Sequence, residues 1–71
     1  NTTVYSYRKT IYMKTDLSHA RYSIYNMLGD KILSGKLSCD RIKTIDLTHT
    51  GIFFVKIISN QQIYSCKIII E

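Results

Sequence analysis

Proline is absent from this 71-residue chain, and glycine occurs only at positions 29, 35 and 51. Without proline, no strand is confined to a sheet edge on that ground. The glycines are too widely spaced to form a phosphate-cradling loop. No apolar run approaches the roughly 20 residues of a membrane helix, and the longest, residues 51–55, ends at Lys56. We therefore expect neither a nucleotide-binding loop nor direct membrane insertion.

The start of the chain carries no charged segment followed by an apolar stretch, so it shows no signal peptide. It begins at Asn1 without a methionine, and we expect residues 1–71 to be one domain of a longer protein. A domain of this length buries only about 60% of its unfolded surface. That leaves room for one packed core and little room for a deep catalytic cleft.

The chemistry-bearing residues are few and scattered. His19 and His49 lie in predicted connections, Cys39 lies in a polar loop, and Cys66 lies in a predicted strand. No closely spaced pair of metal ligands is present, and no Gly-x-Ser-x-Gly elbow marks a nucleophile. A Cys–His pairing stays open from sequence alone. We predict no catalytic residues, no metal site and no cofactor, and therefore no enzyme.

Cys39 and Cys66 leave two possibilities. They would form a disulfide if the domain matures in an oxidising compartment and if their Cα atoms lie within about 7 Å. The alternative, one buried thiol and one loop thiol, is the interpretation that we favour.

The net charge of +5 and the pI of 9.4 raise the question of nucleic-acid binding. The ten basic residues are dispersed, and only Arg8 and Lys9 are adjacent. No basic helix or RNA-binding strand motif is visible. We therefore expect a solvated outer face on strands and no nucleic-acid partner. Lysines on such a face also discourage pairing between sheet edges.

Short runs that alternate between apolar and polar residues predict strands throughout, and no segment has a sustained helical period. The expected fold is all-β, a seven-stranded antiparallel β-sandwich with Greek-key connections. Two positions open or follow turns: Gly29 is expected at positive φ, and Gly51 is expected to begin a strand. The predicted strands are residues 3–7, 10–14, 20–26, 31–36, 41–47, 51–58 and 63–71.

Alternation also predicts which side chains face inward. The last two strands are apolar on both faces, so they lie centrally or carry an exposed apolar strip. Among the six tyrosines, Tyr12 and Tyr25 are the predicted candidates for an exposed patch. The predicted core is Ile11, Met13, Ile24, Leu47, Phe53, Val55, Ile57, Ile68 and Ile70.

Four segments occur in a distinctive order. Residues 24–30 read Ile-Tyr-Asn-Met-Leu-Gly-Asp, and residues 45–47 read Ile-Asp-Leu. Residues 51–58 read Gly-Ile-Phe-Phe-Val-Lys-Ile-Ile, and residues 67–70 read Lys-Ile-Ile-Ile. From about residue 11 to residue 71, this order resembles the type A C-terminal sorting domain of type IX secretion system cargo proteins, the Por secretion system sorting domain.

The resemblance implies a small Ig-like β-sandwich at the C-terminus of a larger secreted protein. Such a domain directs an attached cargo from the periplasm through an outer-membrane translocon to the cell surface or the medium. A sortase-like protease then typically removes the domain, and the cargo is often attached to a lipopolysaccharide. Recognition in the family depends mainly on the conformation of the domain and on its last strands.

The family motifs map onto particular residues of this chain. Gly29 corresponds to the glycine of the early turn, and Gly51 to the glycine that opens the penultimate strand. Phe53 stands where tyrosine is usual. Cys66 stands where Thr, Lys or Ser is often found, and Glu71 stands where Lys or Arg is also common. The residues before Thr10 match nothing firmly, and we expect the cleavage site upstream of residue 1. The predicted recognition or motif residues are Gly29, Gly51, Phe53, Val55, Lys56, Lys67, Ile68, Ile69, Ile70 and Glu71.

An accessory Ig-like module that binds a ligand of its own is the alternative function, because fold does not determine function. A sorting domain must end its native reading frame at or very near Glu71. The two hypotheses therefore differ in where the domain stands in the full-length precursor.

Overall fold

Alternating β-branched and aromatic residues form strands along most of the chain. A computed structural model describes residues 2–60 and 62–71. Its strands are β1 (Thr2–Tyr7), β2 (Thr10–Thr15), β3 (Arg21–Tyr25), β4 (Lys31–Lys36), β5 (Lys43–Asp46), β6 (Gly51–Ser59) and β7 (Gln62–Ile70). Within the described residues, no helix is long and apolar enough to cross a membrane. Gln61, which the sequence places in the last turn, lies outside the described residues.

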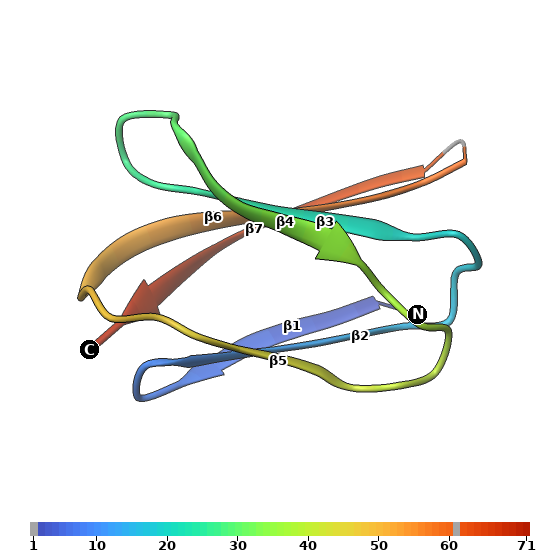
Figure 1. Cartoon of the computed structure of the whole chain (residues 1–71), viewed down its shortest axis with the longest axis horizontal. Helices are drawn as coiled ribbons and strands as arrows, with labels where there is room; N and C mark the ends of the chain where they lie inside the picture. The colour runs from blue at the N-terminus through green and yellow to red at the C-terminus, as the bar shows by residue number, and fades with distance from the viewer. Residues whose placement is uncertain (1, 61) are drawn as a thin grey trace.

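The strands form two antiparallel sheets that face each other as two layers (Figure 1). One sheet has three strands in the order β1-β2-β5, and the other has four in the order β4-β3-β6-β7. The prediction of an all-β fold with seven strands is confirmed. The last two strands differ in position, because β6 lies between β3 and β7, whereas β7 lies at an edge.

Strand bounds differ most at β5, which was predicted over residues 41–47 and is only four residues long. A turn occupies the residues before it. There the amide of Arg41 donates to the carbonyl oxygen of Ser38 at 3.2 Å, and the amide of Asp40 donates to that of Thr15 at 2.8 Å. The segment before β5 therefore contacts β2 through a turn rather than through the regular ladder, and ladder pairing begins at Lys43.

The core lies between the layers and includes every residue predicted for it. Inward-facing residues of β2, β3, β6 and β7 form most of it, as alternation requires. Three further buried hydrophobic side chains were not predicted: Ala20, Tyr22 and Leu37. Ala20 and Leu37 flank strands, and the amide of Leu37 donates to the carbonyl oxygen of Ala20 at 2.9 Å. The predicted loop at residues 37–40 thus begins with a core residue.

Tyr22 is buried because Gly35 lies opposite it on β4. A Cβ atom at position 35 would lie 2.7 Å from the Tyr22 hydroxyl oxygen, closer than real Cβ contacts allow. The missing side chain therefore provides the space that the tyrosine ring occupies.

Two buried polar side chains are satisfied at the same end of the sandwich. The Ser59 hydroxyl donates to the carbonyl oxygen of Ser18 at 2.6 Å. The Thr15 hydroxyl accepts a hydrogen bond from the amide of Leu17 at 3.2 Å. Because unsatisfied polar groups are costly to bury, these bonds let both residues close the core.

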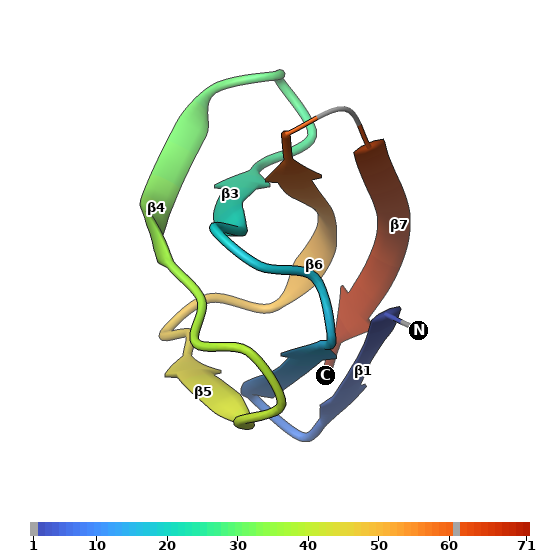
Figure 2. The ribbon, with the colours of Figure 1, turned by 90° about the vertical axis from the view of Figure 1, so that its right-hand side faces the viewer.

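The first and last strands meet across the layers. β1 packs against β7 at one side of the sandwich, whereas β4 and β5 lie at the opposite side (Figure 2). The Ser6 hydroxyl donates to the carbonyl oxygen of Ile69 at 3.1 Å. The backbone edge of β7 is therefore covered near its end by β1.

Candidate recognition surface

The β6–β7 hairpin holds most of the predicted motif residues. Its strands pair without interruption from Gly51 opposite Ile70 to Ser59 opposite Gln62. Phe53, Val55 and Ile57 point into the core. On the other face, the register pairs Ile52 with Ile69, Phe54 with Lys67, Lys56 with Ser65 and Ile58 with Ile63. The predicted facing of both strands is confirmed.

Four of the predicted motif residues are buried: Phe53, Val55, Ile68 and Ile70. Their side chains touch other core residues from both sheets. A partner cannot reach them while the domain is folded. Their place in the motif is therefore explained by packing, since an aromatic or branched side chain fills the space between the layers.

Two motif residues act through the backbone. Gly29 has a φ of 89° and Gly51 a φ of 131°, values that residues with a side chain rarely adopt. In the turn that contains Gly29, the Asn26 side-chain oxygen accepts hydrogen bonds from the amides of Leu28 and Asp30, each at 3.0 Å. The prediction of positive φ at Gly29 is confirmed. Both glycines set the direction in which the next strand begins.

The remaining motif residues reach the surface. Lys67, Ile69 and Glu71 are exposed, and Lys56 is half-buried. Lys56, Lys67 and Ile69 share the outer face of the four-stranded sheet. Glu71 follows β7 and lines a shallow hollow with Ser6, Tyr7, Arg8 and Ile69. Among the predicted motif residues, these four side chains are the ones that a partner can contact.

The outer face of the four-stranded sheet also holds basic residues that the sequence analysis did not single out. Arg21 and Lys36 lie opposite each other on β3 and β4, and Lys31 lies opposite Tyr25. We call the outer face formed by Arg21, Lys31, Lys36, Lys56 and Lys67 the cationic face. Lys31 and Lys36 are five residues apart on β4, and they share this face because the register between β3 and β4 shifts between Ile24 and Tyr25. The sequence alone shows neither this shift nor which strands are neighbours.

Exposed apolar side chains interrupt the cationic face. The exposed fractions are 42% for Phe54, 41% for Ile58, 66% for Ile63 and 57% for Ile69. An exposed apolar strip was one of the two predicted outcomes for the last strands, and it is confirmed. Exposed apolar side chains that gather on one face in this way commonly mark a site of interaction.

The prediction that Tyr12 and Tyr25 form an exposed patch is wrong, because both are half-buried. The Tyr12 ring is covered by Tyr5, and the two ring centroids lie 4.9 Å apart. Tyr25 lies opposite Phe54 on the neighbouring strand. Tyr5 and Tyr7 are exposed instead.

Both cysteines are free thiols, as the favoured interpretation expected. The exposed Cys39 thiol has two acceptors for its one proton, the carbonyl oxygen of Asp16 at 3.4 Å and the Asp40 carboxylate at 3.6 Å. Desolvation, followed by the charge of Asp40, raises the pKa of Cys39. A raised pKa keeps the thiol protonated and weakly nucleophilic. Cys66 is half-buried beside the core.

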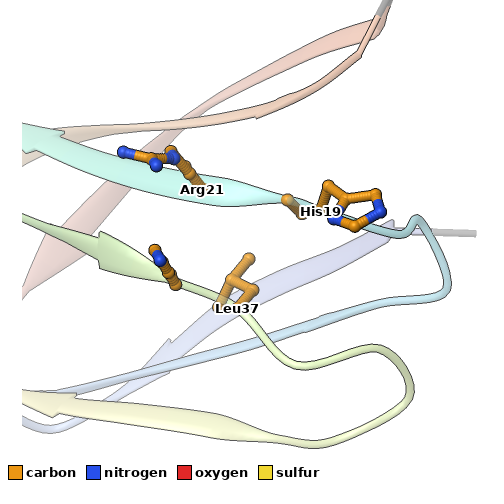
Figure 3. Close-up of a pocket in the computed structure, with 5 residues that line it drawn as sticks. His19, Arg21 and Leu37 are labelled. Carbon is orange, nitrogen blue, oxygen red and sulfur yellow. The ribbon is translucent and has the colours of Figure 1, made fainter.

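The other candidate chemical groups do not converge. A hollow where β3 begins and β4 ends is lined by His19, Ala20, Arg21, Lys36 and Leu37 (Figure 3). Its lining includes no side-chain carboxylate, thiol or hydroxyl, so it lacks a pair of nucleophile and base. Within residues 2–60 and 62–71, no three histidine, cysteine or acidic residues are grouped to hold a metal ion.

A family model described as "Secretion system C-terminal sorting domain" matches residues 7–71. The chain belongs to this family. The match covers six of the seven strands completely and reaches the last residue of β1. It begins a few residues earlier than the resemblance predicted. No curated protein and no solved structure matches the chain.

The family is that of the type IX secretion sorting domain. Membership supports a role as a sorting signal for export to the cell surface or the medium. It also implies attachment to an upstream cargo and interaction with the secretion machinery.

Proposed function

We propose that the sorting domain is a non-catalytic secretion signal at the end of a larger secreted protein. It carries the attached cargo from the periplasm through an outer-membrane translocon, and a sortase-like protease removes it at the cell surface. The family match over residues 7–71 is the observation that carries this proposal.

The topology supports an Ig-like assignment with Greek-key connections. An immunoglobulin sandwich places strands A, B and E in one sheet and C, F and G in the other, and some members add C′ beside C. Counted along this chain, β1-β2-β5 and β4-β3-β6-β7 correspond to A-B-E and C′-C-F-G. Under this proposed assignment, the signal strand β7 takes the position of strand G.

We assign the motif residues to two groups. Lys56, Lys67, Ile69 and Glu71 are exposed or half-buried and contact the secretion machinery. The others maintain the fold that presents them: Gly29, Gly51, Phe53, Val55, Ile68 and Ile70. This division accounts for recognition that depends on conformation, because most of the motif supports the shape of the last hairpin.

The test is a fusion of residues 1–71 to the C-terminus of an inert reporter that carries a signal peptide, in a host with a type IX system. The intact fusion should reach the cell surface. Deletion of residues 67–71 should leave the reporter in the periplasm, because the sheet loses the partner of Gly51–Phe54 and the core loses Ile68 and Ile70. Surface protease accessibility and cell fractionation measure both outcomes.

Two neighbouring substitutions sharpen this test. Ile68→Asp places a charge in the core, whereas Ile69→Asp places the same charge on the outer face. Ile68→Asp should unfold the domain and abolish display, and Ile69→Asp should leave it folded. Display of the reporter by the deletion variant would refute the role of β7. Periplasmic retention of the intact fusion would instead favour an accessory Ig-like binding module.

A further inference from the structure

The four strands β3, β4, β6 and β7 contain five basic residues and no acidic residue. The register places all five on the outer face, where Arg21 lies opposite Lys36 and Lys67 lies opposite Phe54. No carboxylate from the same strands offsets this charge. Like charges opposite each other on neighbouring strands destabilise a sheet. The arrangement thus weakens the domain slightly, and it provides a surface that attracts negative charge.

Apolar groups lie between these charges rather than apart from them. Ile52 and Ile69 pair near one end of the hairpin, and Ile58 and Ile63 pair at the other. Lys56, paired with Ser65, lies between these two isoleucine pairs along the hairpin. Phe54 and Tyr25, side by side on β6 and β3, add two aromatic rings near Lys67.

We infer that the cationic face docks onto an acidic protein surface of the secretion machinery. The partner would present carboxylates to the basic residues and shallow apolar pockets to Phe54 and the isoleucines. Aromatic anchors among complementary charges are typical of specific protein interfaces. The inference rests on the proposed secretion function and names the chemistry of the partner that this function requires.

The pattern favours a protein over an anionic membrane. A membrane-binding surface separates its apolar side from its charges, so that the apolar side can enter the lipid while the charges stay at the headgroups. On the cationic face, burying Phe54 and Ile69 in lipid would also bury Lys67, which lies opposite Phe54 and two residues before Ile69 on the same face of β7. A partner with carboxylates at matching positions meets both kinds of side chain at once.

A second copy of the chain is a poor occupant. Two cationic faces repel each other, since neither has an acidic strand residue. Among the described residues of β1, β2 and β5, the register assigns two charged residues to the outer face, Lys14 and Asp46, whose charges cancel. This face offers no excess of negative charge to which the cationic face could bind.

Matched charge reversals test the inference in the fusion described above. One variant carries Arg21→Glu, Lys56→Glu and Lys67→Glu. The control variant carries Lys14→Glu, Arg41→Glu and Lys43→Glu, which lower the net charge by the same amount outside the cationic face. The first variant should reduce surface display at least about tenfold, because opposed like charges disfavour docking. The control variant should be displayed to the same extent as the unchanged fusion.

Circular dichroism and urea unfolding must show that both variants are folded. A folded face variant that is displayed normally would overturn the inference while leaving the secretion function intact. Failure of the unchanged fusion would instead count against the secretion function itself. If the face variant unfolds, the milder pair Lys56→Gln and Lys67→Gln should still lower display relative to Lys14→Gln and Lys43→Gln.

Two binding measurements address the other occupants. Co-sedimentation with phosphatidylglycerol vesicles at physiological salt should differ little between the two reversal variants, because general attraction depends on net charge. A loss of vesicle binding confined to the face variant would assign the surface to lipid and overturn the inference. Analytical ultracentrifugation that shows a dimer abolished by the same variant would assign it to a second copy.

Discussion

The two outer faces of the sandwich differ in how far they satisfy their own side chains. On the three-stranded sheet, Tyr5 stacks on Tyr12 with ring planes 13° apart. The Thr10 hydroxyl donates to the Asp46 carboxylate at 2.8 Å. On the four-stranded sheet, five basic residues lie among exposed apolar side chains, without an acidic residue in its strands. The side chains of the three-stranded face contact one another, whereas the four-stranded face has charged and apolar groups that a partner could contact.

The same backbone pattern produces both faces. Each strand sends alternate side chains inward, and both sheets contribute branched or long apolar residues to one core. Selection for packing therefore acts on the inner positions of both sheets alike. The outer positions are free to differ, and the docking that we propose rests on their difference.

Replacing each of the two adjacent phenylalanines in turn should give the largest difference in stability between a core position and an outer position. Phe53→Ala should lower the free energy of unfolding by about 3–5 kcal/mol, as for other buried aromatics, a loss large enough to unfold a domain this small. Phe54→Ala, on the cationic face, should cost far less because Phe54 is already 42% exposed. Urea denaturation measures both. Equal losses would show that the two side chains are not on opposite faces of β6.

Gly51→Ala should have the next largest effect. The φ of 131° at Gly51 is strained for any residue with a Cβ, although no atom would clash with that Cβ. The expected cost is about 1–3 kcal/mol. Thr50→Ala, one residue earlier and exposed, is the control and should change stability little. A cost for Gly51→Ala no greater than the control's would mean that the turn can relax.

Tyr5→Ala should measure how far the three-stranded face is stabilised by its own contacts. Loss of the stacked pair should cost about 0.5–1.5 kcal/mol beyond the loss of buried area. Tyr7→Ala removes a more exposed tyrosine from the same strand, outside the stacked pair, and should cost less. If secretion falls while both variants remain folded, the three-stranded face also takes part in recognition.

The smallest expected effect concerns Tyr64 at the inner side of β7. Burial, followed by the neighbouring Cys66, raises the pKa of Tyr64. The folded state therefore holds this proton more tightly than the unfolded chain does. The resulting stability is complete below the usual tyrosine pKa of about 10 and is lost as pH rises through the folded value. Tyr64→Phe should make the loss of stability above about pH 10 less steep; an unchanged slope would contradict it.

Much of the fold follows from the sequence because alternation is local. The inward positions of Phe53, Val55 and Ile57 can be assigned from β6 alone. The turn at Gly29 could also be predicted, since only a few residues tolerate positive φ. These assignments need no knowledge of which strand lies beside which.

The rest depends on strand neighbours. Leu37 is buried because it lies just beyond the last pair of the β3–β4 ladder, where its amide donates a hydrogen bond to the carbonyl oxygen of Ala20. Tyr12 is half-buried because β1 places Tyr5 opposite it. Basic residues dispersed along the chain gather on one face only when β3, β4, β6 and β7 are joined in one sheet. The candidate recognition surface could not be found until that order was known.

The directions of β1 and β7, which pack against each other, also determine how the domain responds to mechanical force. The two strands run in the same direction, and β1 begins at the end of the long axis opposite to where β7 ends (Figure 1). Tension between those two ends acts along the strands. It loads the pairs between β1 and β2, from Thr2–Thr15 to Tyr7–Thr10, together in shear rather than one after another. The sandwich is therefore oriented to resist unfolding when a cargo attached before β1 pulls on the start of that strand.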